Sequence, residues 1–323
     1  TMDYVMAGRH AELGAEITAR LAKRTHAEEE IVATRAEKLA NPTLAATPGV
    51  RSDVSTTVPV PKAPFLGSRV VQEIDLDHIY PFINPIALFR GQWQIKKGAT
   101  SDEEYEALIE DEVRPIFQKW KDLCKREAIL RPAVVYGYFA CNSEGNDLII
   151  CAPKGEKRER LRFSFPRQTD KRRLCISDFF RSTASGETDV LAMHCVTMGS
   201  RASEYARDLF ASNNYTDYLY LHGLGVETAE ALAEFWHKRM RQELGIAGED
   251  SPKVRDLFTQ KYRGSRYSFG YPACPSMEDQ EKLFSLLEPQ RIGCVLTENW
   301  QIDPEQSTSA IVVHHPEAKY FGI

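Results

Sequence analysis

Apolar residues recur every three or four positions in three parts of the chain, and this spacing predicts amphipathic helices. The clearest case is residues 101–127, where Ser101 and Glu104 have the spacing of a capping box at the start of a helix. The same periodicity predicts two further helices, at residues 228–244 and 276–287. Each of these helices has one apolar face, so each is expected to pack against another element.

Short runs rich in β-branched and aromatic residues predict strands. These runs lie at residues 133–141, 148–151, 161–165, 190–198, 292–296 and 310–314. A glycine-containing turn joins the first two runs as a hairpin. Because hairpins and helices follow one another without a repeating βαβ order, the sequence predicts an α+β fold.

The first 63 residues have a different character. Residues 1–40 predict a helix whose apolar stripe is thin, which is typical of a connector between domains. Residues 41–64 contain five prolines and predict an extended linker. We therefore expect an interdomain connector at residues 1–63, helix first and Pro-rich linker second, and a compact domain at residues 64–323 of a longer protein.

Composition narrows the class of protein. The chain of 323 residues is 42% hydrophobic and 27% charged, with a net charge of −5, as in an ordinary soluble protein. The mild acidity argues against a general nucleic-acid binder, and no apolar run approaches the roughly 20 residues that span a bilayer. Seven scattered cysteines without a Cys-x-x-Cys pair argue against a disulfide framework or a zinc site and favour the reducing cytoplasm.

Two motifs resemble known sites but lack essential parts. Gly223-Leu-Gly225 is half of a dinucleotide fingerprint without its third glycine, so a tight turn between two elements is the better interpretation. His314 and His315 lack the helical spacing and the glutamate of a metalloprotease motif. Adjacent residues of a strand point to opposite faces, so these histidines are not expected to share a metal.

The most unusual stretch is residues 266–275, Arg-Tyr-Ser-Phe-Gly-Tyr-Pro-Ala-Cys-Pro, just before the third predicted helix. Gly270 allows a positive φ, the two prolines stiffen the backbone, and Arg266 offers a planar cationic fork. Together with the start of a helix, these features suit a small ligand that carries a carboxylate. A rigid structural loop explains the same residues equally well.

The residues Arg266-x-x-x-Gly-Tyr-Pro-Ala-Cys-Pro275 resemble the signature of the activation domain of cobalamin-dependent methionine synthases. Further similar segments follow the family's order: Pro64-Phe-Leu-Gly67, residues 82–93, Ala229–Glu234 with His237 and Arg239, Leu296-Thr-Glu298, His315-Pro316 and Lys319-Tyr-Phe321. The similarity covers residues 64–323, and residues 1–63 resemble the family's connector from the cobalamin-binding domain.

The resemblance implies a helmet-like or C-shaped domain with a twisted, mainly antiparallel sheet and flanking helices. Its implied function is to bind S-adenosylmethionine and present it to cob(II)alamin for reductive methylation. This step reactivates an enzyme that transfers methyl from methyltetrahydrofolate to homocysteine. Cobalamin belongs to a neighbouring domain and zinc to the homocysteine domain, so this chain alone is not expected to methylate homocysteine.

The resemblance also implies partners and binding residues. The partners are the cobalamin-binding domain and flavodoxin or a related flavoprotein reductase; a monomer is expected, with no nucleic acid or membrane. Arg266 is expected to pair with the ligand carboxylate and Glu230 to lie near its amino end. The residues assigned to ligand binding are Asn84, Glu230, Arg266, Ser268, Gly270, Tyr271, Ala273, Tyr320 and Phe321. No catalytic residue and no metal ligand is assigned.

Alternatives to these assignments remain. Tyr320 could be core packing, and Glu230 could be a solvated charge. At residue 84 some family members carry an aspartate, and this chain departs from that pattern with Asn84. Residues 154–173 hold nine basic and three acidic residues, which suit either a solvated hairpin or a docking face for flavodoxin. A non-catalytic module that senses S-adenosylmethionine is the alternative function.

Overall fold

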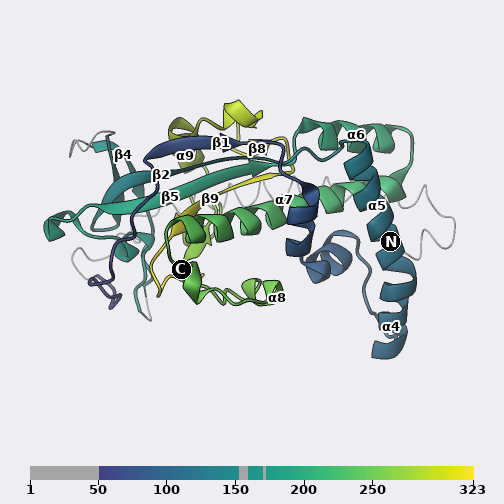
Figure 1. Ribbon diagram of the computed structural model, residues 1–323, viewed down its shortest axis with the longest axis horizontal. Coiled ribbons are helices and arrows are strands. Elements are labelled where there is room, and N and C mark those ends of the chain that lie inside the picture. Colours follow the sequence, from purple (N-terminus) through teal and green to yellow (C-terminus); the bar gives the residue numbers. More distant parts are fainter. Residues whose placement is uncertain (1–50, 153–158, 170–171) are drawn as a thin grey trace. The chain divides into compact units, whose positions relative to one another are not determined.

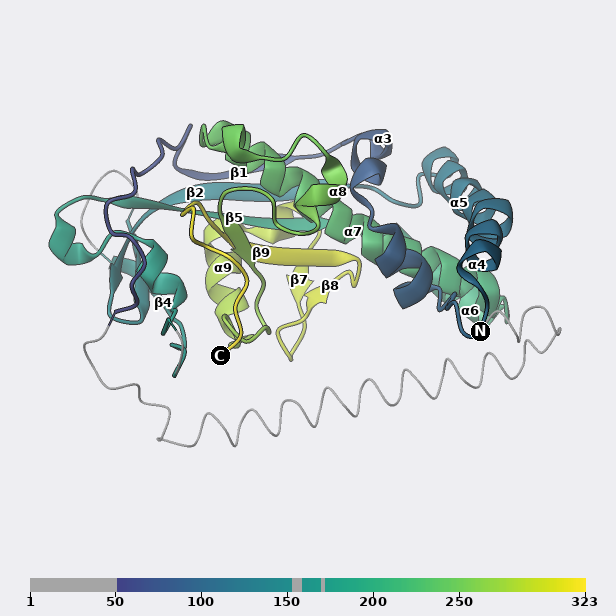
Figure 2. The ribbon, with the colours of Figure 1, turned by 90° about the horizontal axis from the view of Figure 1, so that it is seen from below.

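The computed structural model describes residues 51–152, 159–169 and 172–323 (Figures 1 and 2). The helix expected at residues 1–40 lies outside these residues. The described chain forms two compact units: unit 1 contains residues 85–129 and 204–224, and unit 2 contains the remainder. The domain boundary expected at residue 64 stays a prediction.

Unit 1 is helical. Its elements are the π-helical turn η3 (Ala87–Gln92), α4 (Asp102–Leu108), the π-helical turn η4 (Ile109–Val113), α5 (Arg114–Arg126) and parts of α6 (Ser200–Ala211) and α7 (Tyr215–Glu243). The capping box is confirmed: Glu104 N–H donates to Ser101 Oγ over 3.1 Å, and Ser101 N–H donates to the Glu104 carboxylate over 3.0 Å. The wider π-turn precedes Pro115, which cannot donate the usual i→i−4 hydrogen bond.

Trp93 forms the centre of unit 1. Its indole N–H donates to the carbonyl of Tyr220 over 3.1 Å, and its ring packs edge-on against Phe117. A Cβ on Gly223 would lie 2.9 Å from Trp93 Cδ1, so glycine permits the close approach of α7 at this point. The turn expected at residues 223–225 is therefore wrong, because these residues continue α7 and serve packing.

Unit 2 contains an antiparallel sheet. Within the described residues its strands are β1 (Gly67–Val71), β2 (Ala133–Glu144), β3 (Asp147–Cys151), β4 (Glu159–Ser164), β5 (Asp189–Thr197), β6 (Ser265–Tyr267) and β9 (Ser307–Val313). Their order is β4-β3-β2-β5-β9-β6, and β1 also pairs with β2. A separate small ladder joins β7 (Val295–Leu296) to β8 (Ile302–Asp303). The expected antiparallel α+β fold is confirmed.

Short helices and turns connect these elements: α3 (Leu76–Ile79), η2 (Tyr80–Phe82), η5 (Ile176–Phe179), η6 (Thr183–Ser185), η7 (Ala247–Glu249), α8 (Val254–Leu257) and η8 (Pro289–Ile292). The helix α9 (Asp279–Leu287) lies against one face of the sheet, and the C-terminal part of α7 lies against the other (Figure 1). No helix in the described ranges has the length and apolar character needed to cross a bilayer.

The strand register decides what each face carries. One row across the sheet, facing α7, is Tyr138, Ala192, Val312 and Arg266. The next row, facing α9, is Gly137, Met193, Ile311 and Tyr267. The α9 face is the main apolar core, whereas the α7 face is mixed and also carries charged and polar side chains, among them Arg266 and His194. Neighbouring residues of the signature therefore serve different purposes.

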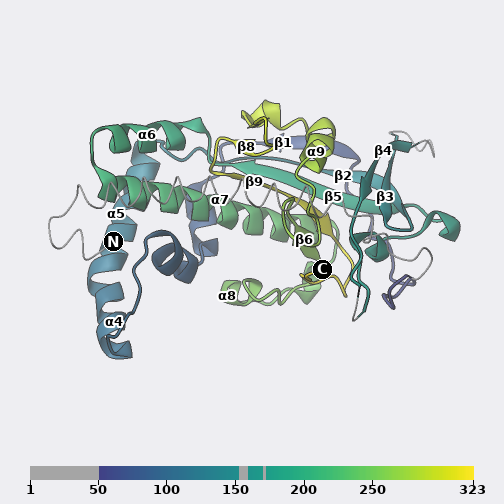
Figure 3. The ribbon, with the colours of Figure 1, turned by 180° about the vertical axis from the view of Figure 1, so that it is seen from behind.

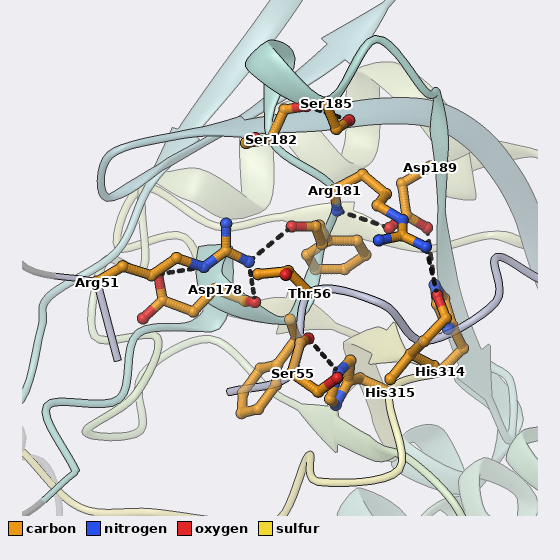
Figure 4. Close-up of a pocket in the computed structure, with 13 residues that line it drawn as sticks. Arg51, Ser55, Thr56, Asp178, Arg181, Ser182, Ser185, Asp189, His314 and His315 are labelled. Carbon is orange, nitrogen blue, oxygen red and sulfur yellow. Dashed lines mark hydrogen bonds and ion pairs between the residues drawn. The ribbon is translucent and has the colours of Figure 1, made fainter. Parts of the chain in front are cut away.

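Residues 51–58, here called the strap, are bound to unit 2 (Figure 4). Arg51 Nη2 donates to the carbonyl of Asp178 over 2.5 Å, and Val54 is buried in the apolar core. The backbone N–H of Ser55 donates to Glu317 over 3.0 Å, and its carbonyl accepts from His315 over 3.0 Å. The part of the expected linker at 51–58 is thus held in place by the C-terminal segment.

Asp178 binds the strap through its side chain and its backbone carbonyl. Its carboxylate is almost fully buried and accepts from both terminal nitrogens of Arg167, one of them over 2.9 Å. It also accepts from the backbone N–H and the hydroxyl of Ser52, over 3.2 and 2.7 Å. A buried arginine and the strap therefore depend on one carboxylate.

We predict that Asp178→Asn lowers the free energy of unfolding by about 3–5 kcal/mol, because it leaves the buried Arg167 guanidinium without its counter-charge. The matched variant is Asp53→Asn, which removes the exposed strap partner of Arg172 and should cost less than about 1 kcal/mol. Urea unfolding at equilibrium measures both values. Equal losses in the two variants would contradict the role given to Asp178.

Candidate functional site

Arg266 lies on β6, which pairs with β9 at an edge of the sheet (Figure 3). Its guanidinium contacts two carboxylates of α7: Nη2 lies 3.3 Å from Glu230 Oε2, and Nη1 lies 3.4 Å from Glu234 Oε2. The two glutamates are four residues apart and so share one face of the helix. The structure therefore brings together the predicted Arg266 and Glu230 and adds a second acid.

The two carboxylates differ in their exposure. The Glu230 side chain is 50% exposed and that of Glu234 is 8% exposed, while Arg266 itself is 22% exposed. Burial raises the pKa of Glu234, and the charges of Arg266 and Arg241 oppose this shift. Burial alone would lower the pKa of Arg266, but Glu234 and Glu230 outweigh it and the pKa is raised. Arg266 therefore stays charged.

The loop after β6 makes a tight turn. The N–H of Gly270 donates to the carbonyl of Cys274 over 2.9 Å, and the N–H of Cys274 donates to the carbonyl of Tyr271 over 2.9 Å. Gly270 has φ +94°, and a Cβ there would lie 2.8 Å from Met277 Sδ, so glycine is required on both grounds. The turn leaves the Tyr271 side chain exposed.

Tyr271 shares the neighbourhood of the charged pair. Burial raises its pKa, the negative charge of Glu230 and the hydroxyl of Tyr320 raise it further, and Arg266 lowers it. Tyr320 is also exposed. Its segment is fixed by Tyr267, whose hydroxyl donates to the carbonyl of Lys319 over 2.8 Å. Four predicted site residues thus interact electrostatically at one place.

Other predicted residues have different surroundings. Ala273 and Phe321 are buried in the core on the α9 face, where the Phe321 ring lies 5.8 Å from that of Tyr267. Ser268 and Asn84 are half-buried. The segment before Asn84 is placed against α7 by the ring contact of Phe82 with Phe235 at 5.4 Å. Ligand contact by Ala273, Phe321, Ser268 and Asn84 stays a prediction.

Residues 75–323 match the family described as "vitamin B12 dependent methionine synthase, activation domain". The chain belongs to this family. It is 44% identical to the methionine synthase of Mycobacterium tuberculosis over its whole length, which is 29% of that protein. It is also 44% identical to the methionine synthase of Mycobacterium leprae, over 84% of the chain and 24% of that protein. The chain thus spans less than a third of the curated relatives it matches.

The fold of this activation domain is similar to that in a crystal structure of the MetH reactivation domain bound to AdoHcy. The TM-score is 0.72, the sequence identity is 24%, and the match covers 87% of this chain and 85% of the other. The twisted, mainly antiparallel sheet with flanking helices is therefore the fold of the family.

A small pocket of the activation domain is lined by residues of the strap (Figure 4). Its volume is about 40 Å³, enough for a water molecule but too small for a drug-sized ligand. His314 Nε2 lies 2.7 Å from Asp189 Oδ1 at its wall, whereas His315 binds the strap carbonyl of Ser55. The two histidines follow the end of β9 at Val313 and have separate partners. The described ranges contain no group of three metal-ligating side chains.

Several arginines of the basic stretch at residues 154–173 form ion pairs with acidic residues elsewhere in the chain, which the composition of the stretch alone does not indicate. Arg162 forms ion pairs with Glu144, Asp147 and Glu159. Arg172 forms ion pairs with Asp53 and Glu317. Arg167 is buried on Asp178. Lys154, Lys157, Arg158 and Lys171 lie outside the described residues. Arg162, Arg167 and Arg172 are thus paired within the domain, and a docking face for flavodoxin stays a prediction.

Sequence reasoning missed a polar row on α7. Glu230, Glu234, His237 and Arg241 follow spacings of four, three and four residues, which place them on one helical face. This spacing is visible in the sequence, but apolar residues at similar spacing form a neighbouring face of the same helix and obscure it. His237 and His194 of β5 are fully buried in this region of the activation domain. Burial lowers the pKa of His237 far below its usual value, and the nearby arginines add to this shift.

We predict an acid-sensitive stability that depends on His194. Burial, with the charge of Arg266, lowers its pKa from 6.5 to about 3 in the folded state. Below pH 6.5 the unfolded chain binds a proton that the folded chain does not, so stability is complete above pH 6.5 and falls toward pH 3. For this histidine the loss between pH 7 and pH 5 is about 2 kcal/mol. His194→Gln should remove it, as measured by urea unfolding at both values.

The control for this prediction is His78→Gln, because His78 is an exposed histidine of α3. This variant should keep the full loss of stability between pH 7 and pH 5. A loss in His194→Gln as large as that of the parent would show that His194 titrates normally in the folded state.

Proposed function

We propose that this activation domain binds S-adenosylmethionine and presents it to cob(II)alamin of a neighbouring domain, for the reductive methylation that reactivates methionine synthase. One observation carries the proposal: a half-exposed Glu230 and a partly exposed Arg266 lie 3.3 Å apart at the signature loop. An α-amino acid offers a carboxylate and an ammonium at similar spacing. The pair therefore suits the methionine end of this ligand.

The roles of the residues follow from their charges. Arg266 binds the ligand carboxylate with charge-assisted hydrogen bonds, which are stronger than neutral ones. Glu230, which is half in solvent, turns from Arg266 to the ligand ammonium. Tyr271 and Tyr320 are exposed, and Tyr271 is influenced by Glu230, Arg266 and Tyr320, so we assign both rings to ligand binding. The AdoHcy in the structurally similar MetH reactivation domain supports a ligand of this class.

The remaining parts of the reaction lie outside this chain. When bound by its own domain, the corrin would supply the cobalt that accepts the methyl group, and flavodoxin or a related flavoprotein reductase would supply the electron. The activation domain positions the bound S-adenosylmethionine and excludes orientations of this ligand that do not lead to methyl transfer. The full enzyme, which we place in the cytoplasm, would then return to methyl transfer from methyltetrahydrofolate to homocysteine.

A sensing module is the second candidate function. In that case bound S-adenosylmethionine would report methyl status and control docking, without giving up its methyl group. The same charged pair would serve both functions, so binding alone does not separate them. Transfer of the methyl group in the presence of an electron donor does.

We predict that Arg266→Lys lowers the affinity for S-adenosylmethionine at least tenfold, which corresponds to about 1.4 kcal/mol or more of binding free energy. Calorimetric titration measures this change. Lysine keeps the charge opposite the buried Glu234 but loses the planar fork that binds a carboxylate with two hydrogen bonds. Arg266→Ala should weaken binding further. Circular dichroism at increasing temperature checks that both variants remain folded.

The same variants test the function in the full-length enzyme. The full-length parent enzyme in the cob(II)alamin state is given reduced flavodoxin and S-adenosylmethionine with a labelled methyl group. It should regain activity, and its cobalamin should carry the labelled methyl group. Arg266→Lys should slow this recovery at least tenfold and leave turnover with methyltetrahydrofolate unchanged. Recovery of the parent without transfer of label would refute the proposal and support the sensor, and unchanged affinity would remove Arg266 from the site.

A paired titration tests Asn84 and Glu230. We predict that Asn84→Asp changes the affinity by about 1 kcal/mol or less, because Glu230 already provides the ligand ammonium with a carboxylate. Glu230→Gln should weaken binding more, since a neutral amide is a poorer partner for the ammonium. If Glu230→Gln binds like the parent while Asn84→Asp binds a hundredfold tighter, the role given to Glu230 is wrong.

A further inference from the structure

Arg266 has a second acidic partner that the family resemblance did not assign. Glu234 Oε2 lies 3.4 Å from Arg266 Nη1, and Glu234 Oε1 lies 3.9 Å from Arg241 Nη1. The Glu234 carboxylate therefore lies between two guanidinium groups. One of these groups belongs to the candidate site, and the other belongs to the interior.

The interior guanidinium is firmly held. Arg241 is 1% exposed, and its Nε and Nη2 donate to the two oxygens of Asp250 over 2.8 and 2.9 Å. Its guanidinium carbon lies 4.0 Å above the centre of the Tyr262 ring. Such a bidentate and stacked arginine has little freedom to move. Glu234 therefore forms an ion pair with a fixed positive charge through one oxygen and with Arg266 through the other, and neither contact is a hydrogen bond.

The difference between Glu230 and Glu234 separates two kinds of contact. Water surrounds half of Glu230, so replacing its contact with Arg266 by another carboxylate costs little. Glu234 is 8% exposed, and separating it from Arg266 would leave a buried charge less compensated. An anion that approaches Arg266 from solvent can therefore displace Glu230 but not Glu234.

We propose that Glu234 is a positioning residue for the ligand carboxylate: it holds Nη1 of Arg266 and leaves the Nη2 edge for the ligand. This inference rests on the proposed function, in which Arg266 binds that carboxylate. Glu230 is the exchangeable partner of Nη2, and Glu234 is the permanent partner of Nη1. Without Glu234 the guanidinium would keep its charge but lose its orientation.

A comparison of two ligands tests the proposal in this chain. S-adenosylmethionine and its decarboxylated analogue differ in the carboxylate that Arg266 would bind. Glu234→Gln should weaken S-adenosylmethionine about tenfold and the decarboxylated analogue less than threefold, measured by calorimetry. A role confined to folding would weaken both ligands to the same extent.

The matched control is Glu243→Gln, a change on the same helix. The Glu243 carboxylate accepts from the hydroxyls of Tyr136 and Tyr138 over 3.1 and 3.0 Å, so its loss affects stability. It should leave the ratio of the two affinities as in the parent. Equal weakening of both ligands by Glu234→Gln, or none, would overturn the positioning role.

A second measurement needs no ligand and separates the two hypotheses. In the ligand-free protein, the Nε–H signal of Arg266, assigned by its loss in Arg266→Lys, should exchange with water at least tenfold faster in Glu234→Gln than in the parent. Glu230→Gln should leave its exchange within threefold. Equal exchange in parent and Glu234→Gln would refute the inference. Failure of the parent to bind S-adenosylmethionine would instead refute the proposed function, and the exchange rates would still decide the role of Glu234.

Discussion

A guanidinium that is only partly in water requires compensating charge close by, since an uncompensated buried ion is very unfavourable. Arg266 lies at the edge of the sheet of unit 2, and α7 supplies the compensation through two glutamates one helical turn apart. The second glutamate is itself buried and needs Arg241, which in turn needs Asp250. The polar face of α7 follows from this alternation of charges. Burial is the main cause of the lowered pKa of the nearby histidines, and the positive charges beside them add to it.

The alternation of side chains along β6 connects this charged face to the rest of the domain. Arg266 points to α7, and its neighbour Tyr267 points to the apolar core and binds the carbonyl of Lys319. One short strand therefore positions both the charged pair and the segment that carries Tyr320. That segment is also bound to the strap through Glu317. The site thus depends on contacts between parts of the chain that are far apart in sequence.

The sequence predicted what depends on local pattern. The capping box at Ser101, the hairpin strands and the periodic part of α7 were all readable. The first half of α7 was not, because the glycine that signals a turn in isolation serves here to admit Trp93. The strand β6 was missed because three residues carry no measurable alternation, and its pairing with β9 decides the matter.

The candidate site shows the same division. Arg266, Tyr271 and Glu230 were predicted because they belong to a recognisable signature and helix, and the structure places Arg266 next to Glu230. Glu234 was missed, although it stands one turn after Glu230, because its importance comes from burial and from Arg241. Neither the burial of Glu234 nor its closeness to Arg241 can be seen in a single sequence. A residue that acts through a second charged residue can be recognised only when both are placed in space.

The free domain already pairs Arg266 with Glu230, and this pair constrains what can replace it. A ligand with a carboxylate alone would take Arg266 and leave Glu230 beside a second negative charge, which is unfavourable at such short range. A ligand with an ammonium alone would take Glu230 and leave Arg266 with Glu234. A ligand that carries both groups exchanges one neutral pair for two, so the charge of the site stays balanced throughout. Under the proposed function, the preference for an intact α-amino acid therefore arises from the ion pair of the free protein as much as from new contacts with the ligand.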